Sequence, residues 1–297
     1  MRRGFTLVEM LVVLSILAVL TLVAVQATEN FGQQARFDVT QTTLNNIRAA
    51  IVGDPTLRNS DGTPRVTGYI ANTGRLPTGT TLLNELLVQP MGLATSAVQV
   101  FDSDRDLTND VSLSSGWNGP YIRLSVAQTD VLDGWGNPFS VTNGPPYVVT
   151  SHGSDGDSTG DETIFNEDIS LSIALSEYQG TLKFQMFEIS SGSRVDPAAL
   201  GATEALAVLV YGVNAAGGTT GTVQESVVGL TTLATVSPTF QSTWQTTIGN
   251  VAARAVRWTD TNGNGVVDIG ETISKKSYLH YLTVTAGVTQ NVALELR

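Results

Sequence analysis

The chain opens with Met1-Arg2-Arg3-Gly4-Phe5-Thr6-Leu7-Val8-Glu9-Met10, in which two cations and a glycine precede an apolar run that holds one carboxylate. From residue 10 to residue 25, every residue is apolar or small except Ser15 and Thr21. Counted from Phe5, the segment is long enough to cross a hydrocarbon layer of about 30 Å. The sequence therefore predicts a helix that spans a membrane.

A secretory signal peptide is the alternative, since it too has basic residues before an apolar stretch, but its cleavage site follows that stretch at an A-x-A-like triplet. No convincing triplet follows the apolar run here. Gly4 stands before the run instead, and Gly4-Phe5-Thr6-Leu7-Val8-Glu9 resembles the processing site of type IV pilins and of type II secretion pseudopilins. The resemblance implies that a prepilin peptidase removes residues 1–4 as a leader and that Phe5 becomes a new, N-methylated terminus.

Glu9 is the one carboxylate in this apolar span. Such a group costs roughly 2.5 to 3.5 kcal/mol on insertion scales and is a candidate functional residue. In the families that the motif resembles, this glutamate neutralises the N-terminal amine of a neighbouring subunit, here that of Phe5, as the helices assemble into a filament. A carboxylate that reaches a lipid headgroup is the alternative.

Arg2 and Arg3 predict that the N-terminus stays on the cytoplasmic side. We therefore expect a single-pass protein of the inner membrane whose C-terminal part lies in the periplasm or outside the cell.

The helical pattern continues beyond the span, with apolar residues at three- and four-residue steps up to Ile51. Gly53-Asp54-Pro55 then favours leaving helical geometry. We expect one long helix over residues 5–53, with the membrane span at 5–26. Many relatives carry a proline where this chain has Gln26, so the kink that a proline gives is not expected here.

Turns of glycine and proline beside aromatic residues follow, in an order similar to that of the major pseudopilin of the type II secretion system. They are Gly74-Arg75-Leu76-Pro77-Thr78, Gly116-Trp117-Asn118-Gly119-Pro120-Tyr121, Asp133-Gly134-Trp135-Gly136-Asn137-Pro138-Phe139 and Ser151-His152-Gly153-Ser154-Asp155-Gly156. The likeness covers residues 5 to about 169 and implies a globular domain at 54–176 with a small antiparallel sheet. We interpret the aromatic residues as core anchors.

From Gly180 onward, short alternating runs are separated by turn residues, which is typical of an all-β sandwich. The candidate strands are 182–189, 205–213, 223–230, 244–248, 251–258, 277–285 and 289–296. The closing pattern loosely resembles transthyretin-type or carboxypeptidase-regulatory-like modules. The predicted fold class is α+β: a long N-terminal helix with a small pilin-like sheet, and a β-sandwich at 177–297.

Composition excludes several functions. The formal net charge of −11 would be repelled by phosphate backbones, so no nucleic-acid partner is predicted. The chain has no cysteine and only two histidines, which argues against disulfides and a typical zinc site. No nucleophile and base pair or Gly-x-Ser-x-Gly elbow is found, so no enzyme is predicted. A membrane-tethered enzyme would need a cleft with convergent acids.

Two acidic loops predict calcium sites. The first runs from Asp155 through Asp168, and its carboxylates would repel one another without a cation that takes several oxygen ligands. In the related pseudopilins a loop of this type holds calcium, and the resemblance carries that role to Asp155, Glu167 and Asp168. A solvated acidic turn is the alternative.

The second loop, residues 260–271, has the spacing of the 12-residue EF-hand calcium loop. The predicted ligands are Asp260, Asn262, Asn264, the carbonyl of Val266, Asp268 and Glu271. The flanking residues alternate like strands, so we expect a calcium-binding connection between strands. An unoccupied Asn-Gly-rich hairpin is the alternative. A third acidic group at 102–110 has neither a glycine nor a closing glutamate, and we interpret it as solvated surface.

These features together predict a structural subunit of a type II secretion pseudopilus. Its expected partners are copies of itself, other pseudopilins, the prepilin peptidase and the inner-membrane assembly platform. The alternative is a type IV pilus minor pilin whose C-terminal sandwich binds a sugar or a protein outside the cell.

Overall fold

The computed structural model describes residues 7–60, 62–78, 82–126, 128–159, 165–214, 219–232 and 241–297. The chain divides into two compact units. Unit 1 comprises Met1–Asn45, Asp130–Thr142 and Val148–Leu171, and unit 2 comprises Asn46–Thr129, Asn143–Tyr147 and Ser172–Arg297. The domain boundaries at 54–176 and 177–297 stay predictions.

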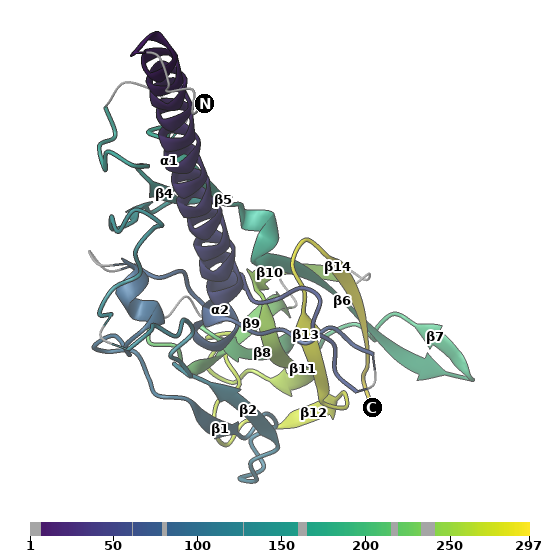
Figure 1. Cartoon of the computed structure of the whole chain (residues 1–297). Helices are drawn as coiled ribbons and strands as arrows, with labels where there is room; N and C mark the ends of the chain where they lie inside the picture. The colour runs from purple at the N-terminus through teal and green to yellow at the C-terminus, as the bar shows by residue number, and fades with distance from the viewer. Residues whose placement is uncertain are drawn as a thin grey trace. The chain divides into compact units, whose positions relative to one another are not determined.

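The long N-terminal helix α1 runs from Leu7 to Val52 (Figure 1). Its 46 residues correspond to a length of about 69 Å at 1.5 Å per residue. The helix ends as expected at Gly53, whose φ of 85° is left-handed and whose N–H donates to the carbonyl of Ala49 at 2.9 Å. Glycine takes this conformation at little cost, which makes it a natural helix terminator.

Unit 1 adds a small sheet and a turn to the helix. The sheet order is β3 (Ser140–Thr142), β4 (Tyr147–Ser151) and β5 (Ile169–Ile173), with β3 and β4 antiparallel. The turn before β3 packs on α1: the N–H of Gly134 donates to Oγ1 of Thr40 at 2.9 Å, and Nε1 of Trp135 donates to Oε1 of Gln33 at 2.6 Å. A Cβ at Gly134 would lie 1.9 Å from the carbonyl oxygen of Arg36, so only glycine fits there.

Unit 2 begins with the last turns of α1 and short elements. They are α2 (Tyr69–Thr73), the 3-10 helices η1 (Leu82–Leu86) and η2 (Leu175–Glu177), and the antiparallel hairpin of β1 (Ala97–Phe101) and β2 (Val111–Ser115). Glu85 is buried and accepts from Tyr69 while it pairs with Arg75 at 3.0 Å. The buried carboxylate is thus paired, as burial of a charge requires.

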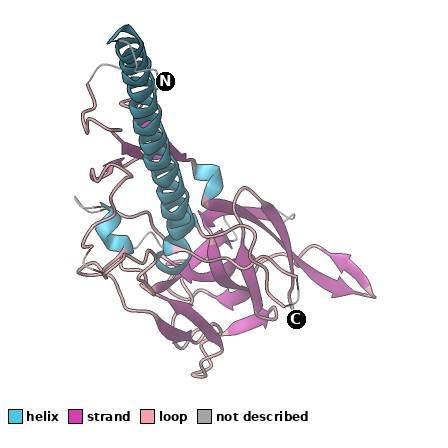
Figure 2. Cartoon of the chain, viewed as in Figure 1, coloured by secondary structure: helices cyan, strands magenta, loops and turns pink. Residues whose placement is uncertain are grey.

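Two sheets of unit 2 form a β-sandwich. Strands dominate the chain after α1 (Figure 2). The strands are β6 (Gln179–Ser190), β7 (Ser193–Val195), β8 (Glu204–Val213), β9 (Val223–Thr232), β10 (Gln241–Thr247), β11 (Gly249–Thr259), β12 (Ile273–Lys276), β13 (His280–Val284) and β14 (Thr289–Glu295). One sheet has the order β10-β6-β14, with β7 on β6; the other has the order β12-β11-β8-β9, with β13 on β11.

The main core lies between these two sheets. Leu182, Phe184, Met186, Val208, Val210, Val251, Ala253, Val292 and Leu294 are among its buried side chains. They come from both sheets, which defines a sandwich. The structure therefore confirms the α+β fold class and places strands where the alternating runs predicted them. The strand predicted at 277–285 is shorter, as β13, and the short strands β7 and β12 were not predicted. β12 and β13 pair with different parts of β11.

A second core covers the opposite face of the β8–β11 sheet. Val111 and Leu113 of β2 pack there with Leu209, Tyr211 and Trp258. Eight consecutive residues of β8 are therefore buried, because neighbouring elements cover both faces of the strand. This explains why its sequence is a continuous apolar run and not an alternating one.

Candidate functional site

The N-terminal half of α1 exposes apolar side chains. Its most apolar 18-residue window has a mean hydropathy of 2.7, and none of that window is buried by the rest of the chain. By length and composition this helix can cross a membrane. Leu7, Leu11 and Leu14 are each more than 60% exposed. Exposed apolar surface of this extent needs lipid or another helix to cover it.

Glu9 lies in the first turn of α1, with an exposed side chain. The partial positive charge of a helix N-terminus favours a carboxylate at this place. Gly4 and Phe5, the predicted processing site, lie outside the described residues. The predicted pairing of Glu9 with the terminal amine of another subunit stays a prediction.

The loop Asp260–Glu271 connects β11 to β12, as the alternation of its flanks predicted. Asp260 at its start accepts the N–H of Gly265 through Oδ2 at 2.9 Å, and Glu271 at its end accepts the N–H of Thr261 at 2.8 Å. The carboxylates at both ends of the loop are thus held by backbone N–H groups of the loop itself.

Asp268 receives the side chains of two other predicted ligands. The amides of Asn262 and Asn264 donate to its Oδ2 at 2.7 and 2.8 Å. These hydrogen bonds lower the pKa of Asp268 below its usual range, so the carboxylate is charged at neutral pH. The oxygens of Asp260, Asp268 and Glu271 nevertheless do not converge into a group within 4.8 Å in the described part of the chain.

The residues predicted to bind calcium in the earlier loop have separate partners. Oδ1 of Asp168 lies 2.9 Å from Nδ1 of His152, and Oδ1 of Asp155 accepts the N–H of Asp157 at 3.2 Å. Glu167 is exposed, and residues 160–164 of this loop lie outside the described residues. The side chain of His152 thus contacts a predicted ligand. The calcium site here stays a prediction.

In the described part of the chain, acidic side chains come close together in a loop that the sequence pattern assigned to solvated surface. Asp102, Asp104 and Asp106 lie in the loop between β1 and β2, and their ligand oxygens are all within 4.8 Å of one another. An aspartate triad of this kind can bind a hard metal ion, since carboxylate oxygens are the ligands that calcium and magnesium prefer. The aspartates at every second position, 102, 104 and 106, were the signal in the sequence. The loop was not interpreted as a metal site because it has no glycine at the sixth position.

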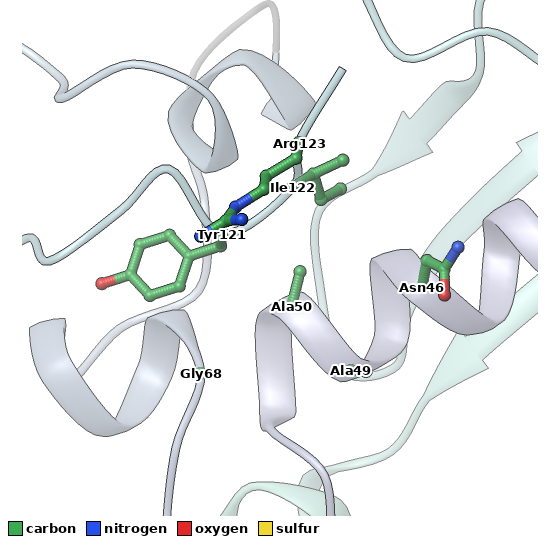
Figure 3. A pocket seen from close by; sticks show the side chains of 7 residues that line it. All are labelled: Asn46, Ala49, Ala50, Gly68, Tyr121, Ile122 and Arg123. Atoms are coloured by element: carbon green, nitrogen blue, oxygen red, sulfur yellow. The ribbon is translucent and has the colours of Figure 1, made fainter. Parts of the chain in front are cut away.

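A pocket of about 390 Å³ lies at the C-terminal end of α1. Figure 3 shows Ala50 of the helix pointing toward the segment that carries Ile122 and Arg123. The lining residues are Asn46, Ala49, Ala50, Gly68, Tyr121, Ile122 and Arg123. Arg123 is the one charged side chain among these seven, so the pocket offers no pair of acid and base.

A comparison with known protein families finds a match at the N-terminus of the chain. Residues 1–25 match the prokaryotic N-terminal methylation motif. The chain is thus prepilin-like, with the motif, a long N-terminal helix and a β-rich remainder. Such a motif implies processing by a peptidase, assembly into a pilus-type filament and anchoring in a membrane by the helix. Proteins of the pilin class are generally structural and not enzymatic.

Two solved structures were found similar to this chain. A leucine-rich repeat protein from Bacteroides thetaiotaomicron is 11% identical over 42% of this chain, with a TM-score of 0.20, and the chain spans only 16% of that protein. A candidate cell adhesion protein from Bacteroides fragilis is 13% identical over 77% of this chain and 90% of its own, with a TM-score of 0.21. Scores this low carry no argument. A search of curated proteins finds no match.

Proposed function

We propose that this protein is a structural subunit of a type II secretion pseudopilus. A prepilin peptidase cuts it after Gly4, and Phe5 is then N-methylated. The helix anchors the chain in the inner membrane with the remainder in the periplasm or outside the cell. The chain then polymerises on the assembly platform with its own copies and with other pseudopilins. The observation that carries this proposal is an uncovered apolar helix that begins within the matched methylation motif.

Assembly replaces the lipid around the apolar helix with the helices of neighbouring subunits. Lipid covers the exposed side chains before assembly, and the helices of neighbouring subunits cover them afterwards. A carboxylate such as that of Glu9 costs roughly 2.5 to 3.5 kcal/mol in an apolar span. The Phe5 amine of the next subunit offsets this cost by supplying the opposite charge. The pairing therefore fixes the axial register between neighbouring helices.

Substitution of Glu9 tests the proposal in the native host. Glu9→Gln keeps the shape and removes the charge, so we expect the variant to be inserted and trimmed normally but to be lost from sheared filaments. Glu29→Gln, the same change further along α1, is the control and assembles normally. Two results contradict the proposal. One is a mass of the purified wild-type protein that shows residues 1–4 still attached, and the other is normal assembly of Glu9→Gln.

The adhesive pilin is a second candidate because the sandwich has a polar outer face. A depression of about 360 Å³ on the β10-β6-β14 sheet is lined by side chains that can donate or accept hydrogen bonds. They include Lys183, Gln185, Arg194, Gln241, Thr243 and Asn291. Deletion of the chain's gene separates the two candidates: loss of secreted hydrolases supports export, and loss of surface attachment with normal secretion supports adhesion.

We further propose that calcium occupies both predicted loops. In the Asp155 loop it would join Asp155, Glu167 and Asp168; in the loop of residues 260–271 it would replace the hydrogen bonds that now hold the carboxylates. An ion that binds only the folded chain raises the stability of the fold. Calcium should therefore raise the melting temperature of the chelator-treated full chain in detergent. Asp155→Asn and Glu271→Gln should each remove part of the rise, and no rise at all contradicts the assignment.

A further inference from the structure

The loop between β1 and β2 shares two left-handed backbone positions with the loop of residues 260–271, although it has no glycine at either position. Counted from Asp102, the fourth and sixth residues are Arg105 and Leu107, with φ of 58° and 72°. Counted from Asp260, the same places hold Gly263 and Gly265, both with φ of 72°. Non-glycine residues rarely take this left-handed conformation, because it costs about 1 to 2 kcal/mol each. Two such residues in one loop indicate that the loop is held in place by other contacts.

The hydrogen bonds of the two loops also correspond. The first aspartate accepts the N–H of the sixth residue, at 2.7 Å from Leu107 to Asp102 in one loop and at 2.9 Å from Gly265 to Asp260 in the other. The fifth side chain accepts the N–H of the seventh residue, which for Asp106 and Thr108 is a bond of 2.8 Å. Asn264 accepts the N–H of Val266 in the same way at 2.8 Å, so the two loops share these turns.

Asp104 provides evidence of a missing ligand that is independent of the loop's own geometry. Its side chain is only 7% exposed. Oδ2 accepts from Arg254 at 2.8 Å and from Lys276, whereas Oδ1 is buried and has no hydrogen-bond partner. A buried acceptor without a donor costs about 1 to 3 kcal/mol. A cation beside this carboxylate, which converges with those of Asp102 and Asp106, would satisfy it.

The charges around the triad leave room for a divalent cation. Asp110 adds a fourth carboxylate, which accepts from Arg254 at 2.5 Å. Arg105 is paired with Glu225 at 2.8 Å and so compensates a charge outside the group. The loop thus has four carboxylates, of which Asp104 and Asp110 contact the two cations Arg254 and Lys276. The remaining negative charge of two matches that of one calcium or magnesium ion.

Two cations hold the carboxylate of Asp104, because Arg254 and Lys276 both donate to its Oδ2. The two cations also fix the orientation of the carboxylate, because they occupy Oδ2 from strands of the sandwich.

We propose that Asp102, Asp104 and Asp106 bind a calcium ion, a site separate from the two loops discussed above. Oxygen ligands of flexible spacing favour calcium over zinc, which takes nitrogen and sulfur, and over magnesium, which demands near-ideal octahedral geometry. The ion joins the β1–β2 hairpin to β11 and β12 through the shared Asp104. This proposal does not depend on filament assembly.

Calorimetric titration of the full chain in detergent micelles, after chelator treatment, tests the site. The titrant is calcium chloride, with magnesium chloride in a parallel run. All measurements use a Glu271→Gln and Asp155→Asn background, which weakens the other two loops. Asp106→Asn removes one charge but keeps the oxygen that accepts the Thr108 N–H. Asp196→Asn, an exposed aspartate outside all three loops, is the matched control.

We expect the background protein to bind one further calcium ion, Asp106→Asn to bind it at least tenfold more weakly, and Asp196→Asn to match the background. Circular dichroism should show that all variants keep the same strand content. Equal affinity of Asp106→Asn and Asp196→Asn overturns the proposal, as does absence of calcium binding in the folded background protein. Tighter binding of magnesium than of calcium overturns the choice of ion.

Discussion

The contact between the turn of residues 133–137 and α1 makes a sharp prediction for Gly134→Ala. The added Cβ would lie 1.9 Å from the carbonyl oxygen of Arg36, 2.7 Å from its carbonyl carbon and 2.9 Å from its Cα. These are backbone atoms of a helix, so they cannot turn aside as a flexible side chain would. The turn has to move away from the helix, and the hydrogen bond from Gly134 to Thr40 is then lost.

The expected cost follows from these two effects. Overpacking against a rigid surface costs about 1 to 3 kcal/mol. Loss of the hydrogen bond adds about 1 kcal/mol. The free energy of unfolding should therefore fall by about 2 to 4 kcal/mol. Gly134 does not have a positive φ, so alanine meets no backbone strain there. Without the contact, Gly134→Ala would instead stabilise the protein by about 0.4 to 1 kcal/mol, because alanine reduces the entropy of the unfolded chain.

Thermal unfolding of the full chain in detergent, followed by circular dichroism, measures the sign. A loss of 2 to 4 kcal/mol corresponds to a fall in melting temperature of roughly 4 to 16 °C for a protein of this size. Gly32→Ala is the matched control: Gly32 is within α1 with nothing near its Cβ position, so helix propensity predicts a gain of about 0.8 to 1 kcal/mol. An equal or higher melting temperature for Gly134→Ala would refute the packing of this turn on α1.

Three further outcomes are expected. The hydrogen bond from Arg257 lowers the pKa of Glu204, so the stability difference between wild type and Glu204→Gln should be full above pH 5 and decline as the pH falls below the ordinary value of 4.5. Trp258→Ala should cost about 3 to 5 kcal/mol in chemical denaturation, and Trp258→Phe clearly less, because Trp258 is fully buried with an unpaired Nε1. Leu107→Gly should not lower the free energy of unfolding, since it relieves a positive φ. Met91→Gly, at an exposed turn position, should lower the free energy of unfolding by about 0.4 to 1 kcal/mol, because glycine raises the entropy of the unfolded chain.

Local signals in the sequence were enough to find α1 and most strands of the sandwich. The break at Gly53-Asp54-Pro55 predicted the end of α1, and the structure ends the helix at Val52. Alternation predicted the strands of the sandwich because each has one face toward the core between the sheets. The run at β8 was found as a strand, but its cover on both faces was not foreseen, since periodicity does not reveal which element packs on which.

The aspartate triad was missed for a specific reason. The EF-hand pattern requires glycine at the sixth place, and Leu107 stands there with a φ of 72°. A rule based on residue type excludes such a loop, whereas the folded chain imposes the conformation through the contacts of Asp104 with Arg254 and Lys276. Those contacts join residues more than 140 positions apart, so no local pattern could indicate them.

The loop between β1 and β2 contacts the loop of residues 260–271, so metal binding in one loop should affect metal binding in the other. Nε of Arg105, in the loop between β1 and β2, donates to the carbonyl of Val267, in the loop of residues 260–271, at 3.0 Å. Its guanidinium group is also held by Glu225 of β9, so a shift of either loop changes contacts of the other. An ion that orders one loop should then favour binding in its neighbour, and linkage requires the effect to be equal in both directions. Because this chain has no cysteine, such paired loops can tie the β1–β2 hairpin to the β11–β12 edge of the sandwich where a disulfide is not available.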